Sequence, residues 1–175
     1  MNFDKSTIKV FDNFLDKDEE KSVLEYVSKS SFIWGEIDDK GLPTTGMCHD
    51  IPEEQNIYRL FDIKVRESYR PIRKSHLYRM VINCFAPREI PYFHIDGDTG
   101  MTFIYYIGSS SLDLIPSSGD KWEYNDGGET QIIVNDEIKG ILPLPNRLVG
   151  FDANLIHRAT PFRDKHRFTL AVKFN

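Results

Sequence analysis

Residues 167–174 read Arg-Phe-Thr-Leu-Ala-Val-Lys-Phe. In a β-strand, successive side chains point to opposite faces. One face of this stretch is then apolar throughout: Phe168, Leu170, Val172 and Phe174. The other face carries Arg167, Thr169, Ala171 and Lys173. We therefore predict a strand that packs its apolar face on an outer core and points a guanidinium, a hydroxyl and an ammonium into the interior of a barrel.

Similar strand-like runs occupy the chain upstream of this stretch. They are short, rich in β-branched and aromatic residues, and separated by Gly, Pro, Asn and Asp: LYRMVINCF (77–85), MTFIYYI (101–107), TQIIV (130–134) and LVGF (148–151). None is connected to the next by a helical segment, which favours antiparallel pairing. Residues 76–175 are therefore predicted to form a sandwich or jelly roll.

Two helices are predicted before these strands. Asp16 has the character of an N-cap, and Glu19 stands three residues later as in a capping box, so a helix is expected over residues 17–29. Apolar residues at helical spacing predict a second helix over residues 53–70, which Pro71 ends.

The remaining segments are interpreted as a short strand and two loops. Residues 8–15 are expected to form a strand that runs into a turn, and residues 35–52 lack any period and are expected to be a loop. The long polar segment 108–128 is expected to be a mobile surface loop. Within it, Trp122 and Tyr124 either cover a site as a lid or, in the case of Trp122, anchor the loop on the core.

Composition limits the classes of protein to be considered. The chain has 175 residues, with 22 basic and 27 acidic side chains and a net charge of −5, which argues against a protein that coats a phosphate backbone. Its two cysteines exclude a disulfide scaffold and suit a reducing compartment. No apolar run is long enough to span a membrane and no signal peptide is evident, so we expect a cytoplasmic protein without membrane contact.

A histidine and a carboxylate stand two residues apart in the sequence His94-Ile95-Asp96. At the end of a strand, both would point to the same side. A further histidine would complete the facial triad of two histidines and one carboxylate that holds Fe(II) and leaves coordination positions open. Taken alone, the pair is better explained as a loop histidine near a turn carboxylate.

The C-terminal third supplies the missing groups. His157 follows an apolar strand-like run, and Arg167 comes ten residues later. A buried guanidinium needs an anion, and a carboxylate fits it through two parallel hydrogen bonds. The alternatives are a salt bridge to a carboxylate of the protein itself, or a solvated edge strand.

These motifs together resemble the iron(II)/2-oxoglutarate-dependent dioxygenases of the prolyl 4-hydroxylase type. The resemblance rests on H-x-D, a distal His, and an Arg ten residues later with a Thr two beyond it. Further similar stretches stand in the family's order: VFDNFLDKDE (10–19), GGET (127–130) and PNRLVGF (145–151). The resemblance implies a mainly β (α+β) fold, a double-stranded β-helix or jelly roll with N-terminal helices packed on one sheet. It also implies one dioxygenase domain over residues 1–175, with residues 1–75 as helical support and 76–175 as the core.

The same resemblance implies a set of site residues. His94, Asp96 and His157 would bind Fe(II), and Arg167 would pair with the distal carboxylate of 2-oxoglutarate, assisted by the hydroxyl of Thr169. The implied cofactors are Fe(II) and the cosubstrate 2-oxoglutarate, with ascorbate as a further candidate.

A second, shorter likeness concerns cosubstrate contacts. Asn83 stands in N-C-F-A-P, which is similar to the N-x-Y-A-P of the alkyl-lesion repair branch, whose Asn and Tyr touch the cosubstrate. Phe85 replaces that Tyr, so the hydroxyl would have to come from Tyr78, Tyr92 or Tyr105, of which Tyr78 and Tyr105 are taken as the candidates. Lys173 matches the spacing of an Arg that lies near the metal-proximal carboxylate in that branch.

The function implied is hydroxylation of a C–H bond, with consumption of O2 and 2-oxoglutarate and release of succinate and CO2. The substrate expected by family branch is a protein side chain, with prolyl first, or a small metabolite; a nucleic acid is disfavoured by the acidic charge. The alternatives from other classes are a jelly-roll module that binds a metal or ligand without turnover, and a barrel of cupin type.

Overall fold

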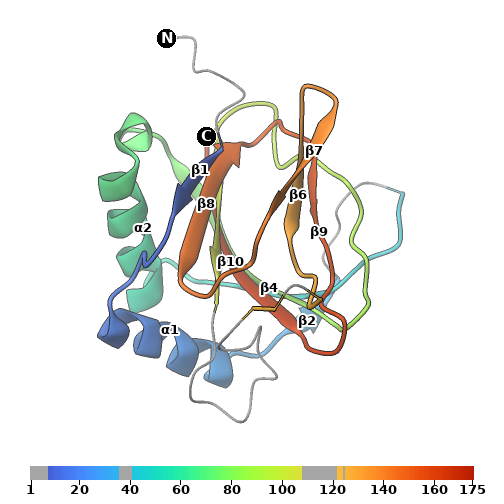
Figure 1. The fold of residues 1–175 in the computed structure, drawn as a ribbon. Coiled ribbons are helices and arrows are strands. Elements are labelled where there is room, and N and C mark those ends of the chain that lie inside the picture. The colour runs from blue at the N-terminus through green and yellow to red at the C-terminus, as the bar shows by residue number, and fades with distance from the viewer. Residues whose placement is uncertain (1–7, 36–40, 108–121, 124) are drawn as a thin grey trace.

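The computed structural model describes residues 8–35, 41–107, 122–123 and 125–175 (Figure 1). Within them, seven strands form one antiparallel sheet, in the spatial order β1 (Lys9–Phe11), β8 (Arg147–Asp152), β5 (Met101–Tyr106), β10 (Arg167–Phe174), β4 (Leu77–Phe85), β3 (Met47–Asp50) and β2 (Ile33–Trp34). A second antiparallel sheet has the order β7 (Glu137–Ile141), β6 (Thr130–Val134) and β9 (His157–Ala159). The helices are α1 (Lys17–Lys29), α2 (Asn56–Ser68) and the 3-10 turn η1 (Arg70–Ile72).

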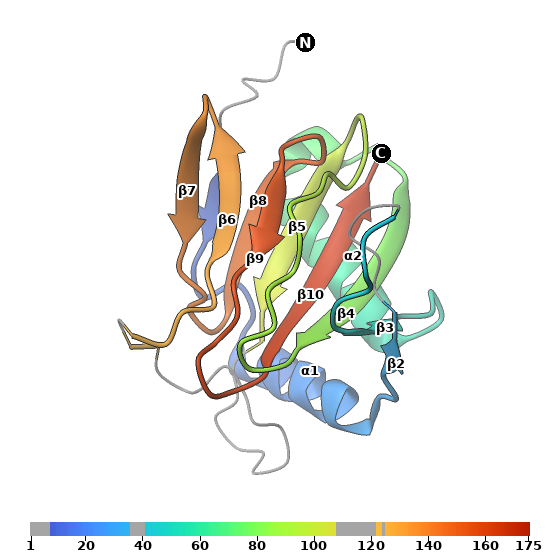
Figure 2. The same ribbon diagram turned by 90° about the vertical axis from the view of Figure 1, so that its right-hand side faces the viewer.

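The two sheets and the helices form layers. The smaller sheet faces one side of the seven-stranded sheet, and α1 and α2 cover the other side (Figures 1 and 2). This arrangement confirms the predicted mainly β jelly roll with N-terminal helices packed on one sheet. None of the described helices is both long and apolar enough to cross a membrane.

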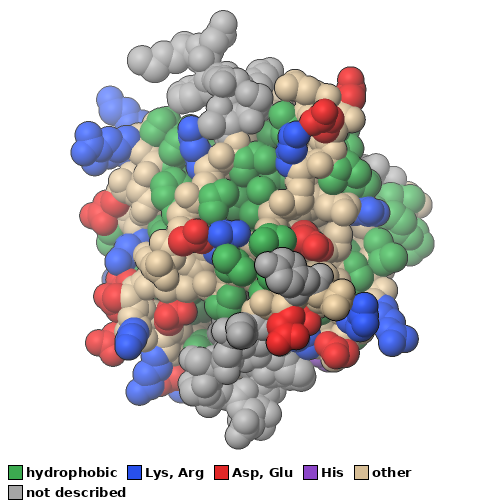
Figure 3. All heavy atoms as spheres, viewed as in Figure 1, with side chains coloured by type: hydrophobic (Ala, Val, Ile, Leu, Met, Phe, Trp, Pro, Cys, Tyr) green, Lys and Arg blue, Asp and Glu red, His purple; other side chains and the backbone are tan. Residues whose placement is uncertain are grey.

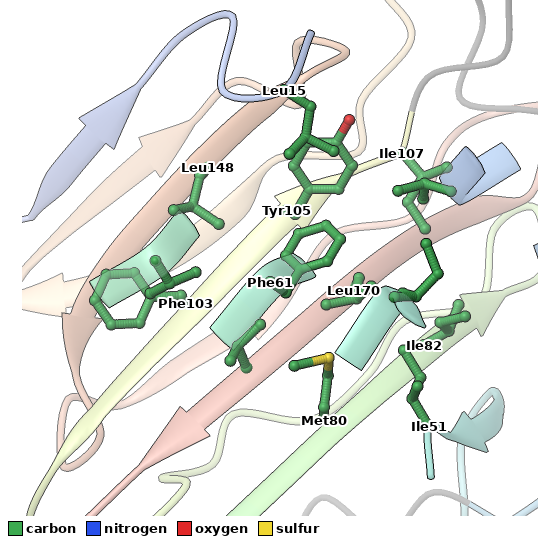
Figure 4. Packing of buried hydrophobic residues seen from close by; sticks show 14 of the residues in the cluster. Leu15, Ile51, Phe61, Met80, Ile82, Phe103, Tyr105, Ile107, Leu148 and Leu170 are labelled. Atoms are coloured by element: carbon green, nitrogen blue, oxygen red, sulfur yellow. The ribbon is translucent and has the colours of Figure 1, made fainter. Parts of the chain in front are cut away.

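The main hydrophobic core lies between the helices and the large sheet. The apolar face of β10 takes part in it, and Phe61 and Val65 of α2 pack there at 0% exposure (Figure 4). Complete burial of one such side chain stabilises the fold by about 1.5–3 kcal/mol. The alternation predicted for β10 is therefore confirmed on its outer face.

The ends of the two helices follow their sequence signals. The Asp16 carboxylate accepts hydrogen bonds from the backbone N–H of Asp18 (3.0 Å) and Glu19 (2.9 Å), and the Glu19 carboxylate accepts one from the N–H of Asp16 (2.9 Å). The predicted capping box is thus confirmed. The second helix begins at Asn56, three residues later than predicted, and Pro71 lies in η1 just beyond it.

The predicted loop over residues 35–52 is wrong at its end, because Met47–Asp50 forms β3 and pairs with β4. The short edge strand β2 was also not predicted. Neither segment has a strong strand signal of its own: β3 is extended because it pairs with the edge of β4, and β2 because it pairs with β3. Residues 36–40 lie outside the described part of the chain.

Two further expectations concern the remaining segments. The strand predicted over residues 8–15 is limited to Lys9–Phe11. Of the predicted lid residues, Tyr124 lies outside the described residues, as does most of the expected loop 108–128. Trp122 donates its indole N–H to the carbonyl of Gly127 (2.9 Å), which belongs to the same segment, so this contact does not decide between the lid and the anchoring interpretations.

The start of β8 is fastened to the N-terminal segment by Asn146. Its backbone has φ +59°, a left-handed conformation that Asn adopts more readily than most residues. Its side-chain oxygen accepts a hydrogen bond from the N–H of Leu15, and its amide donates to the carbonyl of Leu15, both at 2.8 Å. This double contact explains an Asn within the PNRLVGF stretch.

Candidate active site

Three potential metal ligands come together where the small sheet meets the segment after β4. His94 and His157 exchange two backbone hydrogen bonds, His94 N–H to His157 C=O (3.0 Å) and His157 N–H to His94 C=O (2.9 Å). Asp96, two residues after His94, points to the same side. One ligand atom from each of the three residues lies within 4.8 Å of the others.

Backbone carbonyls orient both imidazole rings. Nδ1 of His94 lies 3.1 Å from the carbonyl oxygen of Tyr92, and Nδ1 of His157 lies 2.9 Å from that of Leu155. A nitrogen facing a carbonyl oxygen carries the hydrogen, so the other nitrogen presents its lone pair. The two Nε2 atoms lie 3.7 Å (His94) and 3.5 Å (His157) from the Asp96 carboxylate oxygens.

The charge states of these ligands suit a cation. Burial, reinforced by His94 and opposed by the charge of Asp96, lowers the pKa of His157 to about 4, so the ring is neutral at pH 7. Burial by itself raises the pKa of Asp96, but the charges of Lys173 and His157 and hydrogen bonds from Lys173 and Thr102 lower that pKa to about 2. The site therefore offers the neutral ring of His157 and the ionised carboxylate of Asp96.

Asp96 is held by a pair of donors on neighbouring strands. Lys173 of β10 and Thr102 of β5 are directly paired across the sheet. The Lys173 ammonium lies 2.7 Å from Asp96 Oδ1, and the Thr102 hydroxyl donates to Asp96 Oδ2 at 2.5 Å. The Asp96 side chain is only 3% exposed.

Arg167 lies at the other end of the same row of β10 and is 2% exposed. Its Nε donates to the Gly128 carbonyl and its Nη2 to the Thr130 hydroxyl, both at 2.9 Å, and its guanidinium lies 5.5 Å from the ring centre of Tyr106. In the described part of the chain, no carboxylate forms a salt bridge with it, which disagrees with the alternative of an internal ion pair.

The stretch Gly127–Thr130 is built to present these two acceptors. Gly127 and Gly128 have φ values of +76° and +85°, which favour glycine. A Cβ on Gly128 would come within 2.4 Å of the Phe162 ring. The glycines thus allow a tight turn against Phe162, and the turn directs the Gly128 carbonyl and the Thr130 hydroxyl to Arg167.

One pocket, open to solvent, connects the two ends. Its lining includes every predicted site residue except Tyr78 and Tyr105: Asn83, His94, Asp96, His157, Arg167, Thr169 and Lys173. Asn83 places its side-chain oxygen in a buried position without a hydrogen-bond partner. Such an atom marks a polar position open to a ligand or a water molecule.

The two tyrosines proposed as hydroxyl donors do not line this cavity. Tyr105 points to the helix side of the sheet, where its ring packs 5.2 Å from that of Phe61 and its hydroxyl lies 3.3 Å from Asn146 Oδ1 (Figure 4). Tyr78 is 40% exposed, and its hydroxyl lies 3.4 Å from the backbone carbonyl of Asp96. The structure does not bring Tyr105 to the site, because β5 turns the opposite set of side chains inward.

The inward set of β5 contains residues that the sequence analysis missed. Tyr106 faces Arg167, and its hydroxyl donates to Thr130 Oγ1 at 2.6 Å. Thr102 and Thr130 were missed as well. The signal for Tyr106 and Thr102 was the alternation of β5, and the signal for Thr130 was its position after Gly-Gly-Glu. Only the register of β5 with β10 shows which face of β5 points inward.

The residues present fit the groups that the resemblance implies. Two imidazoles and an ionised carboxylate on one side of a cavity are the ligand set of an Fe(II) centre with open positions. The buried Arg167, whose hydrogen-bond partners in the described chain are the neutral Gly128 carbonyl and Thr130 hydroxyl, fits the carboxylate of an anionic ligand.

Comparison with known proteins supports the fold. No protein-family model matches the sequence, and no curated protein is significantly similar. Among solved structures, a Pseudomonas putida prolyl-4-hydroxylase is 14% identical, with a TM-score of 0.70, over 96% of this chain and 91% of that one. A Trichoplax adhaerens prolyl hydroxylase, solved with a hypoxia-inducible-factor peptide fragment, is also 14% identical, with a TM-score of 0.72, over 97% of this chain and 83% of that one.

A third similar structure has a different kind of ligand. HygX from Streptomyces hygroscopicus, solved with nickel, 2-oxoglutarate and hygromycin B, is 10% identical, with a TM-score of 0.69, over 99% of this chain and 84% of that one. At these identities the comparisons establish a shared fold. That fold agrees with the resemblance to 2-oxoglutarate-dependent oxygenases of the prolyl 4-hydroxylase type.

Proposed function

We propose that this protein is an Fe(II)- and 2-oxoglutarate-dependent dioxygenase that hydroxylates a C–H bond and releases succinate and CO2. The observation that carries the proposal is one cavity with a ligand triad at one end and a buried guanidinium at the other. The guanidinium of Arg167 has hydrogen-bond partners but no carboxylate partner in the described chain. A protein that had only to fold would not need a buried cation in that state.

Each residue has a defined task in this proposal. His94, Asp96 and His157 would hold the iron on one face and leave its other face open. Bound Fe(II) would supply the activation of O2 that oxidation of a C–H bond requires. Arg167, with the hydroxyl of Thr169 beside it, would bind the distal carboxylate of 2-oxoglutarate and so fix the orientation of the 2-oxo acid.

The rest of the cavity wall would exclude water and orient the ligand. Phe85, Ile104 and Ala171 provide apolar lining between the two polar ends. Tyr106 lies beside the guanidinium and hydrogen-bonds Thr130, so the hydroxyl that holds Arg167 is itself held in place. Such preorganisation places a bound 2-oxo acid in one pose before reaction.

The substrate is proposed to be a protein side chain, possibly a prolyl residue, or a small metabolite. Of the similar structures, one was solved with a peptide and another with hygromycin B, so the fold accommodates both kinds of ligand. On the face seen in Figure 3, Lys and Arg side chains are interspersed with Asp and Glu. Together with the net charge of −5, this supports a substrate other than nucleic acid.

The proposal is tested by anaerobic titration of the metal-free protein with Fe(II) and then 2-oxoglutarate. We expect the weak visible charge-transfer band of a chelated 2-oxo acid, and formation of succinate once O2 is admitted. The band should be lost in His157→Ala, and should require a higher 2-oxoglutarate concentration in Arg167→Met. Absence of the band in the unaltered protein would leave the alternative, a jelly-roll module that binds a ligand without turnover.

A further inference from the structure

We infer that Lys173 makes metal binding depend on an anionic cosubstrate, because its ammonium occupies the carboxylate that the metal needs. This inference rests on the proposed function and concerns the order in which the site is filled. Lys173 would act as a positioning residue that opposes binding of a divalent cation alone and favours binding of the cation together with a 2-oxo acid.

The contact itself is direct and shielded from solvent. Lys173 Nζ lies 2.7 Å from Asp96 Oδ1, and the two side chains are 12% and 3% exposed. The other oxygen of the carboxylate already accepts from Thr102. A divalent cation must therefore bind a carboxylate oxygen that already accepts a hydrogen bond. It must also bind close to the Lys173 ammonium, which contacts the same carboxylate.

The charges around the cavity point the same way. Lys173 and Arg167 line it with one positive charge each, whereas Asp96 is its one carboxylate in the described lining. Adding a divalent cation alone increases the net charge of a site that is already positive. Like charges repel more strongly in a site shielded from water than in solvent. A ligand with two carboxylates, one near each cation, restores the balance.

Lys173 also has a role before any metal arrives. With its partner Thr102 it holds the buried Asp96 carboxylate, which would otherwise be a charge without a counterion in the interior. When a 2-oxo acid binds next to the metal, its metal-proximal carboxylate offers the ammonium a second anion. The same side chain therefore stabilises the ligand-free site and the fully loaded site, and disfavours the state with metal alone.

The test measures Mn(II) binding to the metal-free protein by the electron paramagnetic resonance signal of free Mn(II), with and without 2-oxoglutarate. The decisive variant is Lys173→Met, which keeps the length of the side chain and removes the charge. Lys173→Arg keeps the charge. Lys139→Met is the matched control, because Lys139 pairs with Glu137 on the exposed strand β7.

In the unaltered protein, we expect 2-oxoglutarate to tighten Mn(II) binding by about tenfold or more, within the usual range of coupling between two ligands. In Lys173→Met, Mn(II) alone should bind about fivefold tighter or more, and the gain from 2-oxoglutarate should fall by a similar factor. Lys173→Arg and Lys139→Met should behave like the unaltered protein.

The opposite sign would overturn the inference. If Lys173 only supports the geometry of Asp96, Lys173→Met will bind Mn(II) alone equally well or more weakly. That result would leave the proposed function standing as long as 2-oxoglutarate still tightens Mn(II) binding in the unaltered protein. No Mn(II) binding to the unaltered protein, with or without 2-oxoglutarate, would instead overturn the proposed function and the inference together.

Discussion

The two faces of β10 are both buried, yet they differ in every other respect. The outer face packs Phe168, Leu170, Val172 and Phe174 against the helices. The inner face carries Arg167 at 2% exposure and Thr169 at 2%, as deeply buried as the outer residues. Burial alone therefore does not separate the core of this protein from its candidate site. What separates them is whether the buried groups have their partners within the chain.

The apolar outer face stabilises the folded state, and the charged inner face offsets part of that stabilisation. Apolar side chains between sheet and helices stabilise the fold in proportion to the area they remove from water. A buried guanidinium with only neutral hydrogen-bond partners is costly, because desolvation of the charge is not compensated by an anion. A substitution on the outer face should thus affect stability, and one on the inner face should affect ligand binding.

The largest effect is expected for Arg167→Met. Loss of the guanidinium should weaken 2-oxoglutarate binding to the metal-loaded protein by about 3–5 kcal/mol, a factor between about one hundred and several thousand, as for truncation of one partner of a buried charge pair. Binding is measured by titration calorimetry with Mn(II) in place of Fe(II), so that no turnover occurs.

The same variant should be nearly as stable as the unaltered protein in the absence of ligands. Loss of the hydrogen bonds to Gly128 and Thr130 is offset by removal of a buried charge, so we expect the free energy of unfolding to change by no more than about 1 kcal/mol. Denaturant unfolding checks this. A large loss of stability would show that Arg167 is part of the core after all, and would end the contrast between the faces.

The counterpart on the outer face is Leu170→Ala. Leu170 is 0% exposed in the main core, so its truncation should lower the free energy of unfolding by about 3 kcal/mol. The folded fraction should bind Mn(II) and 2-oxoglutarate with unchanged affinity. A variant that is stable but binds 2-oxoglutarate much more weakly would contradict the separation of roles.

The sequence predicted both faces of β10 because alternation within one strand needs no knowledge of its neighbours. The same reasoning could not choose between Tyr105 and Tyr106 on β5. These residues are adjacent, both are aromatic, and both strand faces of β5 are buried. Only the pairing of Tyr106 with Thr169 puts Tyr106 on the inner face. Register is a tertiary property, and the sequence of a single strand does not contain it.

Local signals were sufficient where the chain supplied its own hydrogen bonds. The capping box of Asp16 and Glu19 could be found from residue types alone, whereas the GGET stretch was singled out only by its resemblance to a known family. The strand Met47–Asp50 could not be found from residue types alone. Its extended conformation depends on pairing with β4, which begins 27 residues after β3 ends (77 − 50). The metal ligands could be grouped in advance only because a known family arranges the same residue types in the same order.

The two adjacent tyrosines offer a smaller, paired test of the two faces. Tyr106→Phe removes a hydroxyl that donates to Thr130 at 2.6 Å, and should cost about 1 kcal/mol of stability and weaken 2-oxoglutarate binding several-fold, because Thr130 holds Arg167. Tyr105→Phe removes a longer contact of 3.3 Å to Asn146 and should leave 2-oxoglutarate binding unchanged. Unfolding and calorimetry on both variants are required. Equal effects on 2-oxoglutarate binding would mean that the register seen for β5 does not hold in solution.

The two cysteines allow the two faces of the large sheet to be compared without mutation. Cys84 lies on the outer face of β4 in the main core, and burial, aided by the charge of Glu89, raises the pKa of its thiol to about 12. Cys48 lies on the inner face of β3, next to the short edge strand β2, with Val81 and Ala171 as its apolar neighbours. An edge opens locally at lower free energy than the centre of a sheet.

In the folded protein at pH 8, iodoacetamide should therefore modify Cys48 slowly and Cys84 more slowly still, whereas both should react at similar rates in denaturant. Peptide mapping by mass spectrometry measures both rates, and faster modification of Cys84 would show that the helix side of the sheet opens first.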